Sequence, residues 1–315
     1  MQINGHILIT GANGFVGQHL SKAFLARGAK VSQVVRFVSP QALETQYALD
    51  LTIREDVANI FSLIQPDFVI HLAGLSNRLN EATQFYDTYD TNLSMSLNVI
   101  DACRKIENFK RLVFLGSCDE YGLAPTPYNE AQREMPTNAY GLSKLAVTQI
   151  LISLFHSHRF PSVILRPTVI YGSGQGNEMF ISSLIQSLLA GRDFAMTNGD
   201  QQRDYIYIND VVDAIIKVVS SNDKINGAVL NIGGGVSYQI KEVAKLVADL
   251  VGPKISRLIQ FGAIQYRSHE VMHYSVEIER ARELLGWYPN TNISVGLQHT
   301  IQQYKKSMVN SISED

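Results

Sequence analysis

The feature that most constrains the fold is an alternation of short apolar runs with longer amphipathic stretches. Apolar runs rich in Val, Ile and Leu occupy residues 6–10, 30–35, 67–74, 111–117 and 162–172. Nearly continuous apolar runs of this length are typical of strands buried on both faces of a parallel sheet. Helical patterns lie between them at 16–28, 92–105 and 139–158. The alternation predicts an α/β fold, a doubly wound parallel sheet of the Rossmann type with helices on both faces.

This alternation of apolar runs and helical patterns ends after Tyr171. The polar segments GSGQGNE (172–178) and TNGDQQRD (197–204) interrupt it, and only 205–210 and 229–235 look like further strands. A chain of 315 residues is long for one core and suits a large domain with a smaller appendage. We therefore expect a dinucleotide-binding domain at 1–171, with returns near 205–232, and a smaller C-terminal substrate-binding lobe. The lobe is expected to comprise 172–204 and 233–315.

Composition excludes several classes of protein. The formal net charge is −2, which offers no global basic field for nucleic acid. The two cysteines lack the paired spacing of a zinc site, and the eight histidines are scattered, so we expect no metal. The N-terminus has no signal-peptide pattern and no window approaches 18 uninterrupted apolar residues. These features predict a cytoplasmic protein with no membrane or nucleic-acid partner.

A glycine-rich turn, ITGANGFVG (9–17), joins the first expected strand to the first expected helix. Gly11, Gly14 and Gly17 would allow a tight turn, close approach of backbone to a pyrophosphate, and close packing of helix on strand. The helix N-terminus would add free N–H donors and the positive end of its dipole. The position of the turn predicts a dinucleotide site whose contacts also include the neighbouring residues Asn13, Phe15 and Val16.

The end of the second expected strand bears on the cofactor. An acid there would bind the ribose 2′-hydroxyl of NAD, whereas an arginine accommodates the 2′-phosphate of NADP. The strand ends VVRF (34–37), with Arg36 and no carboxylate. This favours NADP(H), the alternative being a solvated arginine at a strand end.

Several motifs together resemble the extended branch of the short-chain dehydrogenase/reductase superfamily, the NAD-dependent epimerase/dehydratase family. They are the Gly-x-x-Gly-x-x-Gly spacing, Asp50-Leu51, HLAG (71–74), Asn92 and a Tyr-x-x-x-Lys pair at Tyr140 and Lys144. The usual Asn-x-x-Gly-Thr reads NLSMS (92–96) here. Members of this branch mostly act on nucleotide-activated sugars. The resemblance implies cofactor contacts from Asp50, Leu51, Leu72, Ala73, Gly74, Tyr140 and Lys144.

Tyr140 and Lys144 are four apart on an expected helix and so share one face. An ammonium beside a phenol favours the phenolate and makes the tyrosine a usable acid or base near neutral pH. Ser117, at the end of the strand before this helix, is expected to be the third member, donating a hydrogen bond to the substrate oxygen. The alternatives are an exposed helix pair and a serine that caps a strand end.

The segment LGSCDEYG (115–122) bears on the choice among chemistries. Within the family that this chain resembles, dehydratases of the dTDP-glucose type carry Asp-Glu directly after the serine. This chain has Cys118 and Asp119 at those two positions. The epimerising cysteine of GDP-fucose synthases falls where Asp119 stands, so we expect Cys118 to be a small buried residue. A carboxylate at 119 resembles the GDP-6-deoxy-4-ketomannose reductases. GDP-mannose dehydratases share it, but their glycine turn differs from GANGFVG, and SHEV (268–271) resembles the reductases' PSEV.

Residues of the expected lobe resemble a nucleotide-diphosphate clamp. TNGDQQRDYIYINDVV (197–212) contains Arg203, and a guanidinium is well shaped for a phosphate. Arg267 and Glu270 are matching candidates on the other side, and Asn177 could reach the sugar or a phosphate. Surface ion pairs are the alternative for each. A GDP-sugar is favoured, with CDP- and dTDP-sugars open.

These features predict an NADPH-dependent reductase of the 4-keto group of a nucleotide-linked 6-deoxyhexose, with GDP-4-keto-6-deoxymannose favoured. Asp119 joins the predicted catalytic set. A 4-epimerase or 4,6-dehydratase that retains its cofactor is the first alternative, and a non-enzymatic NADP(H) sensor is the second. The stretches at 92–105 and 139–158 are apolar on more than one face, and the family commonly pairs such helices. We therefore expect a homodimer.

Overall fold

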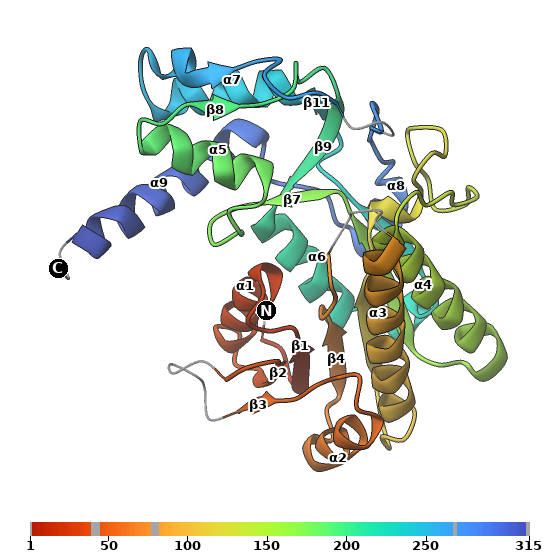
Figure 1. Cartoon of the computed structure of the whole chain (residues 1–315). Helices are drawn as coiled ribbons and strands as arrows, with labels where there is room; N and C mark the ends of the chain where they lie inside the picture. Colours follow the sequence, from red (N-terminus) through yellow and green to blue (C-terminus); the bar gives the residue numbers. More distant parts are fainter. Residues whose placement is uncertain (1, 39–44, 77–81, 267–269, 313–315) are drawn as a thin grey trace.

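The computed structural model describes residues 2–38, 45–76, 82–266 and 270–312 (Figure 1). Within these ranges the central sheet has seven strands, all parallel, in the order β10-β6-β5-β4-β1-β2-β3. The strands are β1 (His6–Thr10), β2 (Lys30–Val35), β3 (Gln46–Ala48), β4 (Phe68–His71), β5 (Arg111–Leu115), β6 (Ser162–Pro167) and β10 (Val229–Ile232).

Alternate side chains of the strands supply two separate cores. Ile7 and Ile9 of β1 pack into one cluster, whereas Leu8 between them packs into the other. The first cluster includes helices α1 (Phe15–Leu25) and α6 (Ile208–Ser220), which pack against each other. The second includes α2 (Arg54–Ile64), α3 (Ala82–Cys103) and α4 (Ala139–His158). Because neighbouring residues of a strand face opposite sides, both faces are covered, and the predicted doubly wound fold is confirmed.

A smaller layer lies above the end of the sheet at which β4 leads into α3 (Figure 1). It contains a three-stranded sheet of β7 (Val169–Tyr171), β9 (Gln202–Tyr207) and β11 (Ser237–Gln239), and a pair of short strands, β8 (Phe194–Ala195) and β12 (Ile259–Gln260). Its helices are α5 (Phe180–Leu189), α7 (Ile240–Val251) and α9 (Ile293–Ile312), and α7 packs against both others. The remaining elements are α8 (Glu279–Leu285) and the 3₁₀ turns η1 (Cys118–Glu120), η2 (Asp223–Ile225) and η3 (Ile255–Leu258). Among the described helices, none combines the length and hydrophobicity needed to cross a bilayer.

Two sequence-based expectations about strands need correction. The apolar run at 162–172 is not one strand: β6 ends at Pro167 in the main sheet, and β7 pairs with β9 instead. The pattern does not reveal this change of sheet because Val169, Ile170 and Tyr171 continue the apolar run across it. The segment 205–210 belongs to β9 only as far as Tyr207, and α6 begins at Ile208. The proposed domain limits stay a prediction.

Candidate active site

The glycine turn leaves the first turn of α1 open. Gly11 has φ +68°, and a Cβ there would lie 2.8 Å from the backbone nitrogen of Ala73. A Cβ on Gly17 would lie 2.5 Å from the carbonyl oxygen of Gly11, so both positions require glycine. Gly14 is the N-cap of α1 and has no side chain to bond the first helical N–H groups. These donors and the helix dipole fit a pyrophosphate.

The predicted adenosine contacts cluster beside this turn. Asn13 Nδ2 donates to the carbonyl oxygen of Phe37 at 3.0 Å, which joins the turn to the residues after β2. Arg36 is exposed, and its charge reaches Asp50. Hydrogen bonds from the Thr52 backbone and hydroxyl, and then Arg36, hold the pKa of the Asp50 carboxyl below its usual value. Arg36 is thus exposed and lies within electrostatic reach of the Asp50 carboxylate.

The remaining predicted cofactor residues differ in burial. Leu51 is buried in the core between α2 and α3, and its carbonyl accepts a hydrogen bond from Asn98 Nδ2 at 2.9 Å. Leu72 and Ala73, directly after β4, are half-buried, and Gly74 is exposed. Phe15 and Val16 form the half-buried first turn of α1.

Ser117 follows β5 and begins the turn η1. Its Oγ accepts a hydrogen bond from the backbone N–H of Asp119 at 3.1 Å. Because the oxygen is the acceptor in this bond, the hydroxyl proton remains available for donation to a ligand. The backbone N–H of Ser117 donates to Glu120 Oε1 at 2.9 Å, which completes a capping box.

Tyr140 and Lys144 lie in the first turns of α4, which Asn138 caps by accepting from the Gly141 N–H at 2.8 Å. Lys144 Nζ donates to the Leu115 carbonyl at 2.7 Å and lies 5.8 Å from the centre of the Tyr140 ring. Burial lowers the pKa of Lys144 to about 8, and the negative charge of Glu120 opposes that shift. At neutral pH the lysine is therefore mainly an ammonium beside Tyr140.

The helix that carries Tyr140 packs tightly onto the segment that carries Ser117. A Cβ on Gly141 would lie 2.5 Å from the Asp119 carbonyl oxygen, so a side chain there would push the two segments apart. Sequence reasoning missed Gly141, although the Tyr-Gly pair at 140–141 was visible. It also missed the Ser-x-x-Glu capping-box signature at 117–120.

Asn92 and His71 support this arrangement from α3 and β4. Asn92 Oδ1 accepts from the Leu75 N–H at 2.7 Å, and its Nδ2 donates to Ser143 Oγ at 2.9 Å. His71 lies between Thr10 Oγ1 at 2.7 Å and Ser96 Oγ at 3.0 Å. Burial, aided by the Lys144 charge, lowers the pKa of His71 to about 3. This histidine is therefore neutral at pH 7 and does not act as an acid.

Cys118 and Asp119 face different surroundings, as expected. Cys118 is fully buried among aromatic rings, and its Sγ donates to the Arg166 carbonyl at 3.2 Å. Burial raises the pKa of this thiol well above its usual value, so it is a poor nucleophile and proton donor. Asp119 is half-buried, and its Oδ1 accepts a hydrogen bond from the Tyr274 hydroxyl at 3.3 Å.

The predicted diphosphate residues are only partly brought together. Arg203, on β9, forms an ion pair with Glu270 and lies 5.9 Å from the centre of the Tyr274 ring. Tyr274 thus connects Arg203 to Asp119, a link between the two halves of the site that sequence reasoning missed. The Arg267 prediction lies outside the described residues.

Asn177 lies in the exposed loop between β7 and α5 and accepts a hydrogen bond from Gln186. It lines a pocket of about 430 Å³ between this loop and α9, together with uncharged polar side chains such as Gln303 and Tyr304. The loop also approaches the cofactor turn, because a Cβ on Gly172 would lie 3.4 Å from the Phe15 ring. Asn177 thus lines a pocket of uncharged residues that includes neither Arg203 nor Glu270.

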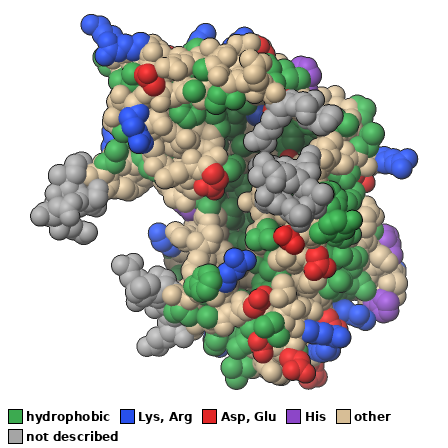
Figure 2. All heavy atoms as spheres, in the orientation of Figure 1, with side chains coloured by type: hydrophobic (Ala, Val, Ile, Leu, Met, Phe, Trp, Pro, Cys, Tyr) green, Lys and Arg blue, Asp and Glu red, His purple; other side chains and the backbone are tan. Residues whose placement is uncertain are grey.

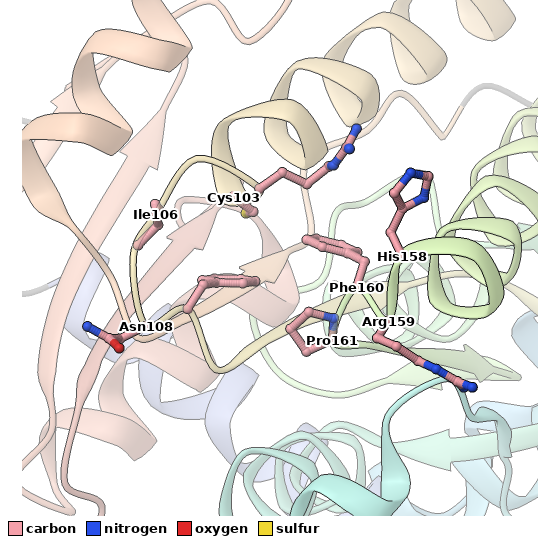
Figure 3. A pocket seen from close by; sticks show the side chains of 9 residues that line it. Cys103, Ile106, Asn108, His158, Arg159, Phe160 and Pro161 are labelled. Atoms are coloured by element: carbon pink, nitrogen blue, oxygen red, sulfur yellow. The ribbon is translucent and has the colours of Figure 1, made fainter.

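The surface is hollowed between the half that holds the main sheet and the lobe above it (Figure 2). A separate pocket of about 350 Å³ lies at the opposite end of the strands, where β5 and β6 begin (Figure 3). Residues from the turns after α3 and α4 line it, including Cys103, His158 and Phe160. Across the described ranges, no cluster of three or more His, Cys, Asp or Glu side chains could hold a metal ion.

An open helix N-terminus after β1, and a Ser/Tyr/Lys set gathered after β5, define a Rossmann-type protein with the geometry of a dinucleotide-dependent enzyme. Residues 7–233 match the model of the NAD dependent epimerase/dehydratase family. This match spans more than half of the chain, which therefore belongs to that family.

Individual relatives are distant and varied. An uncharacterized UDP-glucose epimerase of Bacillus subtilis is 28% identical, with 94% of this chain and 96% of the relative covered. GDP-6-deoxy-D-mannose reductase of Pseudomonas aeruginosa is 26% identical, with 95% and 97% covered. The solved structure of MoeE5 in complex with UDP-glucuronic acid and NAD has a TM-score of 0.86 and 29% identity, with 96% of this chain and all of that chain covered. Family membership identifies an enzyme class that modifies nucleotide sugars with a nicotinamide cofactor.

Proposed function

We propose that this protein reduces the 4-keto group of a nucleotide-linked 6-deoxyhexose, using NADPH. The observation that carries the proposal is the segment after Ser117. The two positions that follow the serine hold Cys118 and Asp119, so the Asp-Glu pair of a dehydratase is missing there. Cys118 is buried and protonated, so it cannot serve as an epimerising cysteine. What remains is Ser117, Tyr140 and Lys144, the set sufficient for a ketone–alcohol interconversion, with Asp119 beside them.

The roles of these residues follow from their contacts. Bound NADPH supplies the hydride for C4 of the sugar. Tyr140 would transfer its proton to the oxygen that becomes negative at C4, and the Ser117 hydroxyl would donate a hydrogen bond to the same oxygen. Lys144, held by the Leu115 carbonyl, would stabilise the tyrosine as it loses its proton and would bind the nicotinamide ribose. Asp119, already bonded to Tyr274, would orient the sugar.

The same proposal assigns residues to the phosphates of the cofactor and to the diphosphate of the substrate. Gly11, Gly14 and Gly17 would form the pyrophosphate turn, and Arg36 would contact the 2′-phosphate of the cofactor. Arg203 would bind the diphosphate of the substrate. For this, contacts with phosphate oxygens must replace its ion pair with Glu270. A GDP-sugar is our first candidate, and its support is the resemblance of GSCDEYG to the GDP-sugar reductases together with the Pseudomonas relative.

A cofactor-retaining 4-epimerase is the second candidate. Two comparisons favour it: the Bacillus relative is named as a UDP-glucose epimerase, and the MoeE5 structure contains NAD with a UDP-sugar. An epimerase returns the hydride to its substrate and so shows no net change in cofactor, whereas a reductase consumes one NADPH for each product.

The deciding experiment supplies NADPH deuterated on the transferred face together with GDP-4-keto-6-deoxymannose. We expect deuterium at C4 of the sugar and stoichiometric NADP⁺. A panel of 4-keto CDP-, dTDP- and UDP-sugars identifies the base if the GDP-sugar is inactive. Conversion of an unoxidised sugar nucleotide without added reductant, with every 4-keto sugar leaving NADPH untouched, would overturn the proposal in favour of the epimerase.

We also propose a twofold homodimer through α3 and α4. These helices pack against each other, and α3 exposes Tyr86 and Leu97, which are 74% and 42% accessible. A helical face that remains apolar outside the core favours association with a second copy. Light scattering at micromolar concentration should give twice the mass of the chain, and a monomeric mass would contradict the prediction.

A further inference from the structure

Glu120 is a buried carboxylate beside the catalytic set with no role in the proposed chemistry. It is fully buried, at 0% exposure, three residues after Ser117. Its Oε1 accepts the Ser117 N–H at 2.9 Å, and a Cβ on Gly116 would lie 2.4 Å from the same oxygen. The carboxylate therefore packs directly against the peptide that joins β5 to Ser117.

Lys144 holds the same segment through a different peptide unit. Its ammonium donates to the Leu115 carbonyl at 2.7 Å, two residues before Ser117. Glu120 and Lys144 thus bind neighbouring peptide groups of residues 115–117 with opposite charges. The negative charge of Glu120 favours the protonated form of Lys144, against the effect of burial.

Arg166, on β6, is the counter-ion of Glu120. Its Nε donates to Glu120 Oε2 at 2.8 Å, and its Nη2 lies 2.7 Å from both Glu120 Oε2 and Glu134 Oε1. The guanidinium also lies 4.6 Å from the centre of the Tyr121 ring. A buried ion pair of this kind contributes little net stability, because the cost of desolvation offsets the attraction. The effect of the Glu120 charge is therefore better sought in its neighbours Ser117 and Lys144.

We propose that Glu120 is a positioning residue that fixes Ser117 through its backbone and supplies the negative charge that keeps Lys144 an ammonium. The identity of the reaction it serves rests on the proposed function, but its effect on Lys144 does not.

The charges around Lys144 determine the sign of the expected effect. Glu120 faces it from η1, Tyr140 from its own helix and His71 from β4, and His71 is neutral. Arg166 and Glu134 complete the network on the far side of Glu120. Removing the Glu120 charge takes away the negative charge that opposes the effect of burial on Lys144, so Lys144 should lose its proton at lower pH.

The variant Glu120→Gln tests this directly, because glutamine keeps the shape and an oxygen for the Ser117 N–H but removes the charge. Since Lys144 is expected to bind the nicotinamide ribose, NADPH affinity should fall as Lys144 deprotonates. We expect the alkaline midpoint of NADPH binding, followed by fluorescence from pH 6 to 10, to move down by about one pH unit. The alkaline limb of kcat should move by the same amount. Glu120→Asp, which keeps the charge, should retain the unmodified midpoint.

The matched control is Glu134→Gln, which removes the other carboxylate on Arg166 without touching the Ser117 segment and should leave the midpoint in place. If Glu120→Gln fails to fold, Glu120→Leu combined with Arg166→Met removes both charges and should show the same shift. An unchanged midpoint in the charge-free variants, or an equal shift in Glu134→Gln, would overturn the inference. Failure of every nucleotide sugar to react would refute the proposed function while the NADPH midpoints still decide the role of Glu120.

Discussion

The cofactor half and the substrate half of the cleft are built in different ways. In the cofactor half, the glycine turn follows β1 and Ser117 follows β5, two parallel strands separated by β4, and Tyr140 and Lys144 lie in the first turns of α4. Partly buried hydrogen bonds of 2.7–3.1 Å hold the turn at Ser117, the start of α4 and the Lys144 side chain. In the substrate half, Arg203 comes from β9, whereas Glu270 and Asn177 lie outside the helices and strands.

This difference separates the residues proposed for hydride transfer from the residues proposed for substrate selectivity. The parallel sheet brings the strand ends together whatever the loops contain, so the hydride-transfer geometry is a consequence of the fold. Under the proposed function, the choice of sugar and base would depend on side chains whose positions are set by a few contacts, such as the Arg203–Glu270 pair. Substitutions in the first half should therefore change turnover or folding, and substitutions in the second half should change substrate affinity.

The largest expected effect is on Tyr140. Loss of a positioned proton donor costs typically ~10²–10⁴-fold in rate, so Tyr140→Phe should reduce kcat on that scale. NADPH affinity should remain close to that of the unmodified protein, because the helix and Lys144 are unchanged. Steady-state kinetics and a fluorescence titration measure the two quantities. Tyr288→Phe, at a residue 58% exposed, is the matched control. Full activity of the Tyr140→Phe variant would contradict the claim that the cofactor half supplies the proton donor.

Arg203 tests the substrate half. A charge-assisted hydrogen bond contributes about 1.5–3 kcal/mol, so Arg203→Gln should raise KM for the nucleotide sugar roughly 10–100-fold. NADPH affinity and kcat should change little. Glu270→Gln is the matched variant: it removes the carboxylate that competes with phosphate, and it should leave KM unchanged or lower it. A large loss of NADPH affinity in Arg203→Gln would show that the two halves are not separable.

The glycine turn tests whether the cofactor half depends on backbone geometry. Gly11→Ala places a Cβ 2.8 Å from the Ala73 nitrogen at φ +68°, and strain of this kind costs about 1–3 kcal/mol. Thermal unfolding should show a clearly lowered midpoint. Gly14→Ala, at φ −71° and with its closest contact at 3.1 Å, should unfold near the unmodified temperature but bind NADPH more weakly. Equal stability of the two variants would contradict the packing argument.

The smallest expected effect is the cofactor preference from Arg36, because this side chain is exposed and Asp50 lies close to it. NADPH should bind about tenfold more tightly than NADH, the low end of a charge-assisted contact. Arg36→Asp should erase or reverse the preference, whereas Arg27→Asp, at the far end of α1, should leave it unchanged. Equal affinities in the unmodified protein would show that Arg36 does not select the cofactor.

The sequence alone determined the fold class, because apolar runs and helical patterns alternate along the chain with little ambiguity. It also placed the strand ends that carry Ser117 and the glycine turn, since these motifs are short and local. Six of the predicted elements coincide with the structure at one or both ends: β1, β2 and α4 at both ends, and β5, β6 and β10 at their starts.

Only the tertiary structure decided which distant groups meet. Arg166 meets both Glu120 and Glu134 because η1, β6 and the loop before α4 converge, and Tyr274 meets Asp119 across 155 positions of the chain. The switch from β6 to β7 was likewise unreadable, because the apolar run continues across it and leaves no periodicity to mark the change. Local patterns encode which face of an element is buried, whereas the partner of a buried charge depends on how the elements pack, and that information is not contained in any single stretch of sequence.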